Sequence, residues 1–271
     1  MSVLFQDKTY PQITQAIKDK ATLLLPLGQT EQHGTHLQTG CDTIIAERVC
    51  NAVAARLEGK LPVLVMPPIC YGYVPKSIQQ WPGSFRVRWE VMINYISDVL
   101  TSAAEMGFDK MIVVSTHGPH GDVARMAARD VFDRTGASVV VSIPHTMVAK
   151  QFAELRKSKV GGASHACEYE TSLLMHFGYP ISLNGLDDRD TVNVCNEWVS
   201  GDMINGRGCV NWSTWALQLS ETGVYGDASC STPETGKATF DAIIEQYIGL
   251  IKFVRAREVP KQPFPVYPRF W

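Results

Sequence analysis

Residues 28–42 read Gly-Gln-Thr-Glu-Gln-His-Gly-Thr-His-Leu-Gln-Thr-Gly-Cys-Asp and concentrate metal-binding side chains in one short segment. The segment holds one glutamate, two histidines, one cysteine and one aspartate, with three glycines among them. Glu31 and His33 are separated by one residue, so both side chains project to the same side of an extended loop. A carboxylate combined with imidazoles and further carboxylates is a ligand set that Zn²⁺, Mn²⁺ or Fe²⁺ prefers. The segment therefore indicates a divalent-metal site.

Simpler roles exist for the same residues when each is taken alone. Asp42 lies just before a helix expected to begin near Thr43, and an aspartate there is also a good N-cap. His33 and His36 could each be an ordinary loop histidine. Their concentration directly after the apolar run 21–27 favours the metal site over these separate explanations.

A second polar cluster, residues 115–122, follows another aliphatic run. His117 comes directly after the predicted strand and precedes a glycine, so it should emerge at the end of that strand. A histidine that caps the next helix is an equally good explanation of this cluster alone. His120 and Asp122 fall in the first turn of the following helix, where the charge of Asp122 suits the positive end of the helix dipole.

The third cluster, Ser-His-Ala-Cys-Glu-Tyr-Glu-Thr-Ser at 164–172, enters a later helix. Glu168 and Glu170 diverge by about 200° on a helix, so one of them should face a site. Ser164 could cap this helix with Glu168 near its first turn, which would give Glu168 a structural role. His165 lies just outside the helix, and its ordinary pKa of about 6.5 suits a proton shuttle. Cys167 is interpreted as a small buried residue.

The elements that carry these clusters alternate between short aliphatic strands and amphipathic helices. Strands are predicted at 23–27, 63–66, 111–115 and 138–142, and helices at 43–57, 90–106, 123–132 and 235–257. This alternation predicts an α/β fold with three layers, in which a mainly parallel central sheet has helices on both faces. Ligands gather beyond the carboxyl ends of such strands, where the polar clusters lie. Residues 183–231 should form loops and a hairpin, followed after the last helix by a Pro-rich tail.

The composition excludes several classes of partner. The chain of 271 residues is 45% hydrophobic and 19% charged, carries a net charge of −2 and lacks a dense Lys/Arg block, so neither nucleic acid nor an anionic membrane is an expected partner. No apolar run approaches the ~20 residues that span a bilayer, and the first residues lack the features of a secretory signal. Seven cysteines without a CxxC pair fit a reducing cytoplasm. Without repeats or linkers, residues 1–271 are expected to form a single domain.

Five motifs together resemble the creatininase (creatinine amidohydrolase) family. The segment Leu-Pro-Leu-Gly-Gln-Thr-Glu-Gln-His-Gly-Thr-His-Leu at 25–37, followed by Asp42-Thr, is similar to the signature of that family. The second and third clusters are similar to its GHGGN-type and HAGExETS-type segments. Trp81-Pro-Gly-Ser84 resembles its Phe-Pro-Gly-Thr, and residues 222–236 resemble its Gly-rich stretch. The matches run in order and cover residues 22–237.

The resemblance implies a three-layer α/β fold, a homo-oligomer such as a hexameric ring, and two divalent ions per chain, with Zn²⁺ the leading candidate and Mn²⁺ or Fe²⁺ as alternatives. By motif position, Glu31 and His117 would bind one ion, His33 and Glu170 the other, and Asp42 would bridge them. His165 would take the place of the catalytic histidine of the family.

The chain departs from the family pattern in the second cluster. Pro119 stands where creatininase itself has an acidic residue that helps to bind its activating metal. His120 stands where many members of the family have an asparagine. The tryptophans that close over creatinine have no clear counterparts near 144–145 and 161. These departures favour a substrate other than creatinine.

The leading hypothesis is a metal-dependent hydrolase that acts on a non-peptide C–N bond of a small molecule, either a cyclic amide or a formamide. The metal ions would lower the pKa of a water molecule, and His165 would pass a proton to the leaving nitrogen. Three alternatives stay open: cleavage of a C–C bond in a cyclic diketone-like substrate, processing of a peptide in an open cleft, and a non-catalytic, metal-stabilised oligomeric binding protein.

Overall fold

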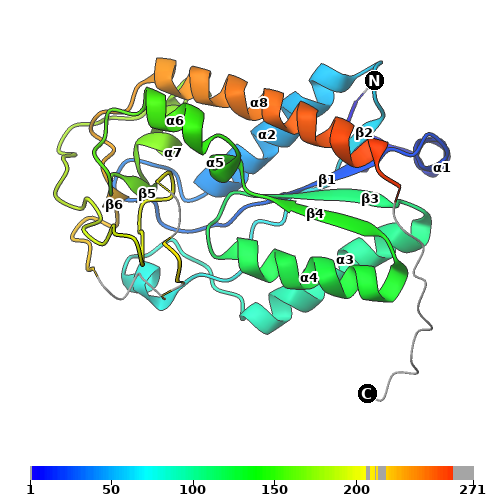
Figure 1. The fold of residues 1–271 in the computed structure, drawn as a ribbon, viewed down its shortest axis with the longest axis horizontal. Helices are drawn as coiled ribbons and strands as arrows, with labels where there is room; N and C mark the ends of the chain where they lie inside the picture. Colours follow the sequence, from blue (N-terminus) through cyan, green and yellow to red (C-terminus); the bar gives the residue numbers. More distant parts are fainter. Residues whose placement is uncertain (1, 206–207, 211, 213–217, 259–271) are drawn as a thin grey trace.

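Four parallel strands form the central sheet of the protein, whose computed structural model describes residues 2–205, 208–210, 212 and 218–258 (Figure 1). The strands lie in the order β2-β1-β3-β4, with bounds β1 Thr22–Leu27, β2 Val63–Val65, β3 Lys110–Ser115 and β4 Ser138–Ser142. All four agree with the predicted strands to within one residue at each end. Every residue of β1 is buried, as expected for an aliphatic strand that is covered on both faces.

Helices cover both faces of this sheet and confirm the predicted three-layer α/β fold (Figure 1). One layer contains α2 Cys41–Leu57, α5 Pro144–Met147, α6 Ala149–Leu155, α7 Glu168–His176 and α8 Pro233–Ala256; the other contains α1 Tyr10–Lys18, α3 Trp89–Met106 and α4 His120–Thr135. Alternation along the strands divides the core accordingly. Leu24 packs with the α2–α8 layer, whereas Leu23 and Leu25 pack with the α3–α4 layer.

The helix ends agree with the sequence better than the helix starts do. α3 and α4 stop at Gly107 and Gly136, which adopt the left-handed backbone conformation that glycine commonly takes after the last turn of a helix. The N-cap of α2 is Gly40, so Asp42 lies inside the first turn and the interpretation of Asp42 as an N-cap was wrong. The predicted cap of α7 by Ser164 was also wrong, because this helix begins at Glu168 after Cys167.

A second, two-stranded antiparallel sheet joins segments far apart in the chain. β5, Ala163–His165, pairs with β6, Tyr225–Gly226, and opposes His165 to Tyr225. The third polar cluster therefore begins on β5. The sequence had placed it after a strand of the main sheet, and that expectation was wrong. The described part of 183–231 is otherwise irregular, apart from an isolated antiparallel bridge between Cys195 and Ser200.

Two further short elements are the 3₁₀ turns η1 Phe5–Asp7 and η2 Lys76–Gln80. The predicted Pro-rich tail lies outside the described residues. Among the residues that the structure describes, no helix has the combination of length and apolar character that crossing a membrane requires.

Candidate metal centre

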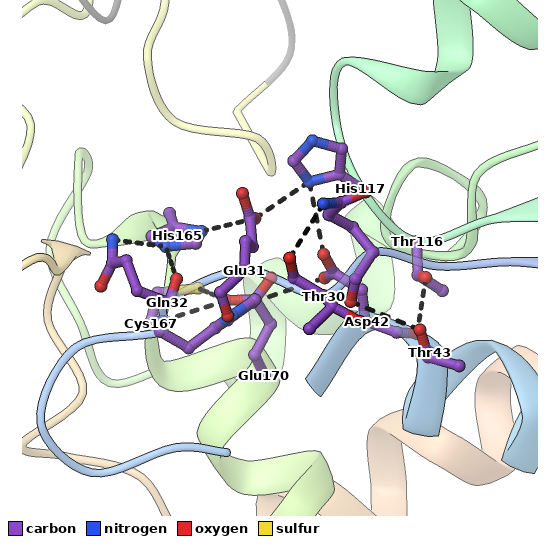
Figure 2. A network of polar contacts seen from close by, with 12 residues as sticks. Thr30, Glu31, Gln32, Asp42, Thr43, Thr116, His117, His165, Cys167 and Glu170 are labelled. Carbon is purple, nitrogen blue, oxygen red and sulfur yellow. Dashed lines mark hydrogen bonds and ion pairs between the residues drawn. The ribbon is translucent and has the colours of Figure 1, made fainter. Parts of the chain in front are cut away.

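The first two polar clusters meet because β1 and β3 are neighbours. Leu27 at the end of β1 pairs with Ser115 at the end of β3, so the loops that follow emerge at one edge of the sheet. His117 Nδ1 lies 3.0 Å from Glu31 Oε1 and 3.3 Å from Asp42 Oδ2. Asp42 comes from the first turn of α2, and Figure 2 shows its carboxylate pointing toward His117 beside that of Glu31.

The third cluster completes the arrangement from the other side. Three groups of residues each place their ligand atoms within 4.8 Å of one another. These groups are Glu31, Asp42 and His117; His33, Asp42 and Glu170; and Glu31, His33 and His165. Glu31, His33 and Asp42 each belong to two of the three groups. Asp42 lies between two histidines, with its Oδ1 3.4 Å from His33 Nε2 and its Oδ2 3.3 Å from His117 Nδ1. The structure thus brings together all six residues that the sequence singled out, and we call this set the Asp42 cluster.

Hydrogen bonds on the outer side of the cluster orient two of its histidines. The His33 Nδ1–H donates to the carbonyl of Glu31 at 3.2 Å, and the His117 Nε2–H donates to the carbonyl of Tyr73 at 3.1 Å. The opposite ring nitrogen of each histidine therefore faces the carboxylates. A histidine that binds a metal through one ring nitrogen usually donates a hydrogen bond from the other, often to a backbone carbonyl.

Several polar atoms at the centre of the cluster are buried without a hydrogen-bond partner in the described part of the chain. They are Glu31 Oε2, His33 Nε2 and Asp42 Oδ2. A buried acceptor that lacks a partner costs about 1–3 kcal/mol, and more when it is charged. All three atoms belong to residues of the candidate ligand groups, and a bound cation would satisfy them, so the donor set fits a divalent metal ion.

The raised pKa values of two histidines in the metal-free cluster also indicate a site for a cation. Burial acts to lower the pKa of His117, but Glu31 and Asp42 raise it to about 10. Burial opposes the shift of His33 also, while Cys41 and Asp42 hold its pKa well above the ordinary value. In the absence of a metal ion, protons on these two histidines supply the positive charge that the buried carboxylates require.

The pKa values of Glu170 and Asp42 are shifted in opposite directions. Burial raises the pKa of Glu170 to about 7, although His33 acts in the opposite direction. For Asp42, burial acts to raise the pKa, but His33 and His117 together hold it far below its usual range. Asp42 is consequently the permanent anion of the cluster, whereas Glu170 exchanges a proton near neutral pH.

Gln32, a residue that the sequence reasoning passed over, fixes the position of His165. The His165 Nε2–H donates to the backbone carbonyl of Gln32 at 2.9 Å, and Nδ1 faces Glu31 Oε1 at 3.5 Å (Figure 2). The side-chain amide of Gln32 accepts from the Gly34 N–H at 2.8 Å and donates to the Gly223 carbonyl at 2.9 Å, which defines its orientation. Gly223 has φ +82°, and a side chain there would collide with this amide.

The remaining polar residues of the three clusters lie outside this centre. Glu168 turns away and accepts hydrogen bonds from the Lys157 and Ser158 amides, as expected if only one of the two glutamates faces the site. His36 contacts Thr171 Oγ1 at 2.9 Å. The buried His120 packs edge-on against His117, with 4.4 Å between ring centroids. Asp122 is exposed and pairs with Arg125 at 2.6 Å.

A cavity of about 1130 Å³ opens onto the Asp42 cluster. Its floor includes Glu31, Asp42, His117, His165 and Glu170. The upper end of the usual size range of ligand pockets is about 1,000 Å³. The cavity therefore has room for more than a single small ring.

The fold and the cluster together define an α/β protein with a candidate divalent-metal centre beyond the carboxyl ends of its parallel strands. Residues 6–251 match the model of the family described as creatininase, creatinine amidohydrolase. The chain therefore belongs to the creatininase family, which confirms the resemblance seen in its motifs.

Relatives and solved structures extend this placement. The chain is 27% identical over 237 residues to a mycofactocin precursor peptide peptidase of Mycobacterium ulcerans, covering 85% of this chain and 84% of that protein. It is 35% identical over 116 residues to a 3-dehydro-scyllo-inosose hydrolase of Thermotoga maritima, covering 43% and 36% of the two chains. A solved structure titled "Creatininase Mn" has the same fold, with a TM-score of 0.76, 20% identity and coverage of 93% and 98%.

Proposed function

We propose that this protein is a hydrolase that uses two divalent metal ions per chain to cleave a C–N bond of an amide. The observation that carries the proposal is the sharing of Asp42 between two groups of candidate ligands. Glu31 and His117 would hold one ion with Asp42, and His33 and Glu170 would hold the other with Asp42. When bound, such ions supply a nucleophilic water at neutral pH and polarise the carbonyl of the substrate.

His165 is placed to move protons in this reaction. Its pKa is lowered to about 4, first by burial and then by the neighbouring His33, so its ring is neutral at pH 7. Because the Gln32 carbonyl engages Nε2–H, the nitrogen that faces the cluster is Nδ1. We infer that Nδ1 accepts a proton from the attacking water and passes it to the leaving nitrogen.

The size of the substrate divides two candidate activities. The sequence predicts a small cyclic amide or a formamide, and the cavity admits such a molecule. The cavity volume also favours a longer amide, including a peptide. The match to a peptide peptidase over most of both chains supports this second candidate. The predicted homo-oligomeric state and cytoplasmic location stay predictions.

Metal analysis combined with an activity panel tests the proposal. Purified protein is saturated with Zn²⁺ or Mn²⁺, freed of excess metal, and examined by elemental analysis; we expect two equivalents per chain. The loaded protein is then offered cyclic amides, formamides and blocked peptides, and we expect hydrolysis of at least one class. One equivalent of metal or less would contradict the binuclear site, and a fully loaded protein that hydrolyses none of the panel would favour a binding protein.

A further inference from the structure

β4 is an edge strand whose outer side faces no other strand among the described residues. The sheet order places it at one end, paired with β3 alone. In a parallel pair every second residue of an edge strand directs its N–H and C=O away from the neighbour. In the part of the chain that the structure describes, no further backbone group hydrogen-bonds to residues 139–141 on that side. Four of the five residues of β4 are only half-buried, whereas β1 is buried throughout.

The cavity follows this edge. Val140 packs with the α2–α8 layer and Val141 with the α3–α4 layer, because successive side chains of a strand point to opposite faces. Both residues nevertheless line the cavity, as do Ser142 and Ile143. Because the cavity touches consecutive residues on opposite faces, it reaches the free backbone edge over the last three residues of β4.

Helices from both layers form the walls of the resulting groove. Asp122 and Arg125 of α4 line one side, and Met147 of α5 and Leu250 of α8 line the other. Figure 1 shows β4 between α4 and α8. The groove is therefore bounded by helices on two sides and by a strand edge along its base.

The groove leads to the Asp42 cluster. Ser142 at the end of β4 pairs with Val114 near the end of β3, and His117 follows β3. His117, His165 and Glu31 line the same cavity as the β4 edge. A chain segment lying along β4 would therefore have one of its ends at the cluster.

We propose that the β4 edge binds an extended peptide as an added strand and that the Asp42 cluster hydrolyses an amide bond of this peptide. The proposal rests on the amide hydrolysis proposed above and names its substrate class. Strand addition uses main-chain hydrogen bonds for affinity and alternate side-chain pockets for selectivity. The residues of this edge that line the cavity, Val140 to Ile143, match an extended peptide segment of about four residues at about 3.3 Å each. A small polyol, by contrast, has no backbone N–H and C=O groups at a regular spacing, so it could not pair with the strand edge in this way.

A scan of backbone methylation tests the binding mode. A library of octapeptides blocked at both ends is incubated with Zn²⁺- or Mn²⁺-loaded protein, and products are identified by mass spectrometry. The best substrate is then resynthesised with one N-methyl group at each position in turn. We expect kcat/KM to fall roughly 2- to 12-fold at every second position outside the scissile bond, which corresponds to one lost hydrogen bond. Uniform sensitivity, or sensitivity at the scissile bond alone, would overturn the added strand.

The same panel separates this inference from the proposed function. Hydrolysis of small cyclic amides or formamides without hydrolysis of any peptide would refute the peptide groove and leave the amide hydrolase intact. Hydrolysis of no amide by the loaded protein would refute the proposed function itself.

Hydrogen exchange on the metal-free protein provides a readout that does not depend on activity. The probe is the best peptide with its scissile amide N-methylated, and exchange is followed in the segment that contains 138–142. We expect these amides to exchange several-fold more slowly when the peptide is present, with little change in the central strand β1. Lack of protection would overturn the proposal. Protection without peptide that increases with protein concentration would also overturn it, because a second copy of the chain would then cover the edge.

Discussion

Two sets of buried carboxylates satisfy their oxygens in different ways. In the first set, Glu168 is fully buried and accepts the Lys157 and Ser158 amides, each at 2.9 Å. Asp202 is equally buried, pairs with Arg156 at 2.9 Å and accepts the Gly161 amide at 2.6 Å. The chain itself supplies the donors that these two carboxylates require.

The Asp42 cluster forms the second set, in which some carboxylate oxygens accept no hydrogen bond from the described part of the chain. Glu31 Oε2 and Asp42 Oδ2 have no hydrogen-bond partner in the described structure, although His117 Nδ1 lies within ion-pair distance of Asp42 Oδ2 and of the other Glu31 oxygen. Glu170, only two residues from Glu168, shares this centre through its candidate ligand group, although its Oε2 also accepts the Cys167 amide at 3.3 Å. Burial is common to both sets, so it does not distinguish a site. The distinguishing feature is whether donors of the chain occupy the carboxylate lone pairs.

Substitution of Asp42 should have the largest effect, because two groups of ligands depend on it. We expect Asp42→Ala to remove measurable activity and to weaken binding of both ions by more than the ~10–100-fold typical of outer partners of a metal site. Asp130→Ala is the matched control, since the side chain of that α4 aspartate is partly exposed, pairs with Arg134 at 3.1 Å and is not among those that line the cavity; its activity should stay within about threefold of wild type. Equal losses in the two variants, measured as kcat/KM and metal content, would place the site elsewhere.

Removal of His165 should separate proton transfer from metal binding. We expect His165→Ala to keep both ions and to lower kcat by ~10²–10⁴-fold, the usual contribution of general acid–base catalysis, with a smaller change in KM. Metal stoichiometry, kcat and melting temperature should be measured on one preparation. If kcat stays within about threefold of wild type with both ions bound, His165 does not transfer the proton.

The adjacent glutamates give the most direct test of the two sets. Glu170→Gln should lose one metal equivalent and retain most of the stability of the metal-free protein. Glu168→Gln should retain both ions but lose about 1–3 kcal/mol of stability, because an amide NH₂ would then oppose the Lys157 and Ser158 amides. Elemental analysis and denaturant unfolding measure the two quantities. The reverse pattern would exchange the roles of the two residues.

The smallest effect concerns pH, and its sign follows from the raised pKa values. The pKa of His117 is raised to about 10 and that of Glu170 to about 7. In the folded metal-free protein, Glu170 therefore keeps a proton that the unfolded chain has lost between about pH 4.5 and 7, and His117 does so between about pH 6.5 and 10. The stability from these protons is complete below the unfolded pKa values and is lost as pH rises through the folded ones. The pKa of Asp42 is depressed, so its opposite contribution changes only in strong acid.

The metal-free protein should therefore melt at a lower temperature at pH 9 than at pH 6, whereas the loaded protein should change less because the ions replace the protons. We expect the rise in Tm on metal binding to grow by about 5 °C over this interval. Calorimetry of both forms in matched buffers measures it. The Asp42→Ala variant serves as a control that should not show the increase. If the rise in Tm on metal binding instead became smaller with increasing pH, the raised pKa values of His117 and Glu170 would be contradicted.

The sequence by itself determined the main sheet and the composition of the cluster. Long aliphatic runs such as those of β1 and β3 have no stable alternative to burial in a parallel sheet, so their bounds followed closely from the residue pattern. Helical geometry predicted that only one of Glu168 and Glu170 faces the site, because residues two apart on a helix cannot share a face, and the resemblance to the family indicated Glu170. The order of motifs along the chain indicated the family and, with it, the six residues that converge.

The tertiary structure alone decided how those residues are supported. β5 and β6 are too short to have a periodicity, and their pairing joins His165 to Tyr225, 60 positions later in the chain. The contact of Gln32 with Gly223 depends on this pairing, as does the ring nitrogen that His165 presents to the cluster. The open edge of β4 is likewise invisible in an aliphatic strand, because strand order follows from long-range packing. Local patterns encode which surfaces must be buried, whereas the choice of neighbour depends on contacts between distant segments.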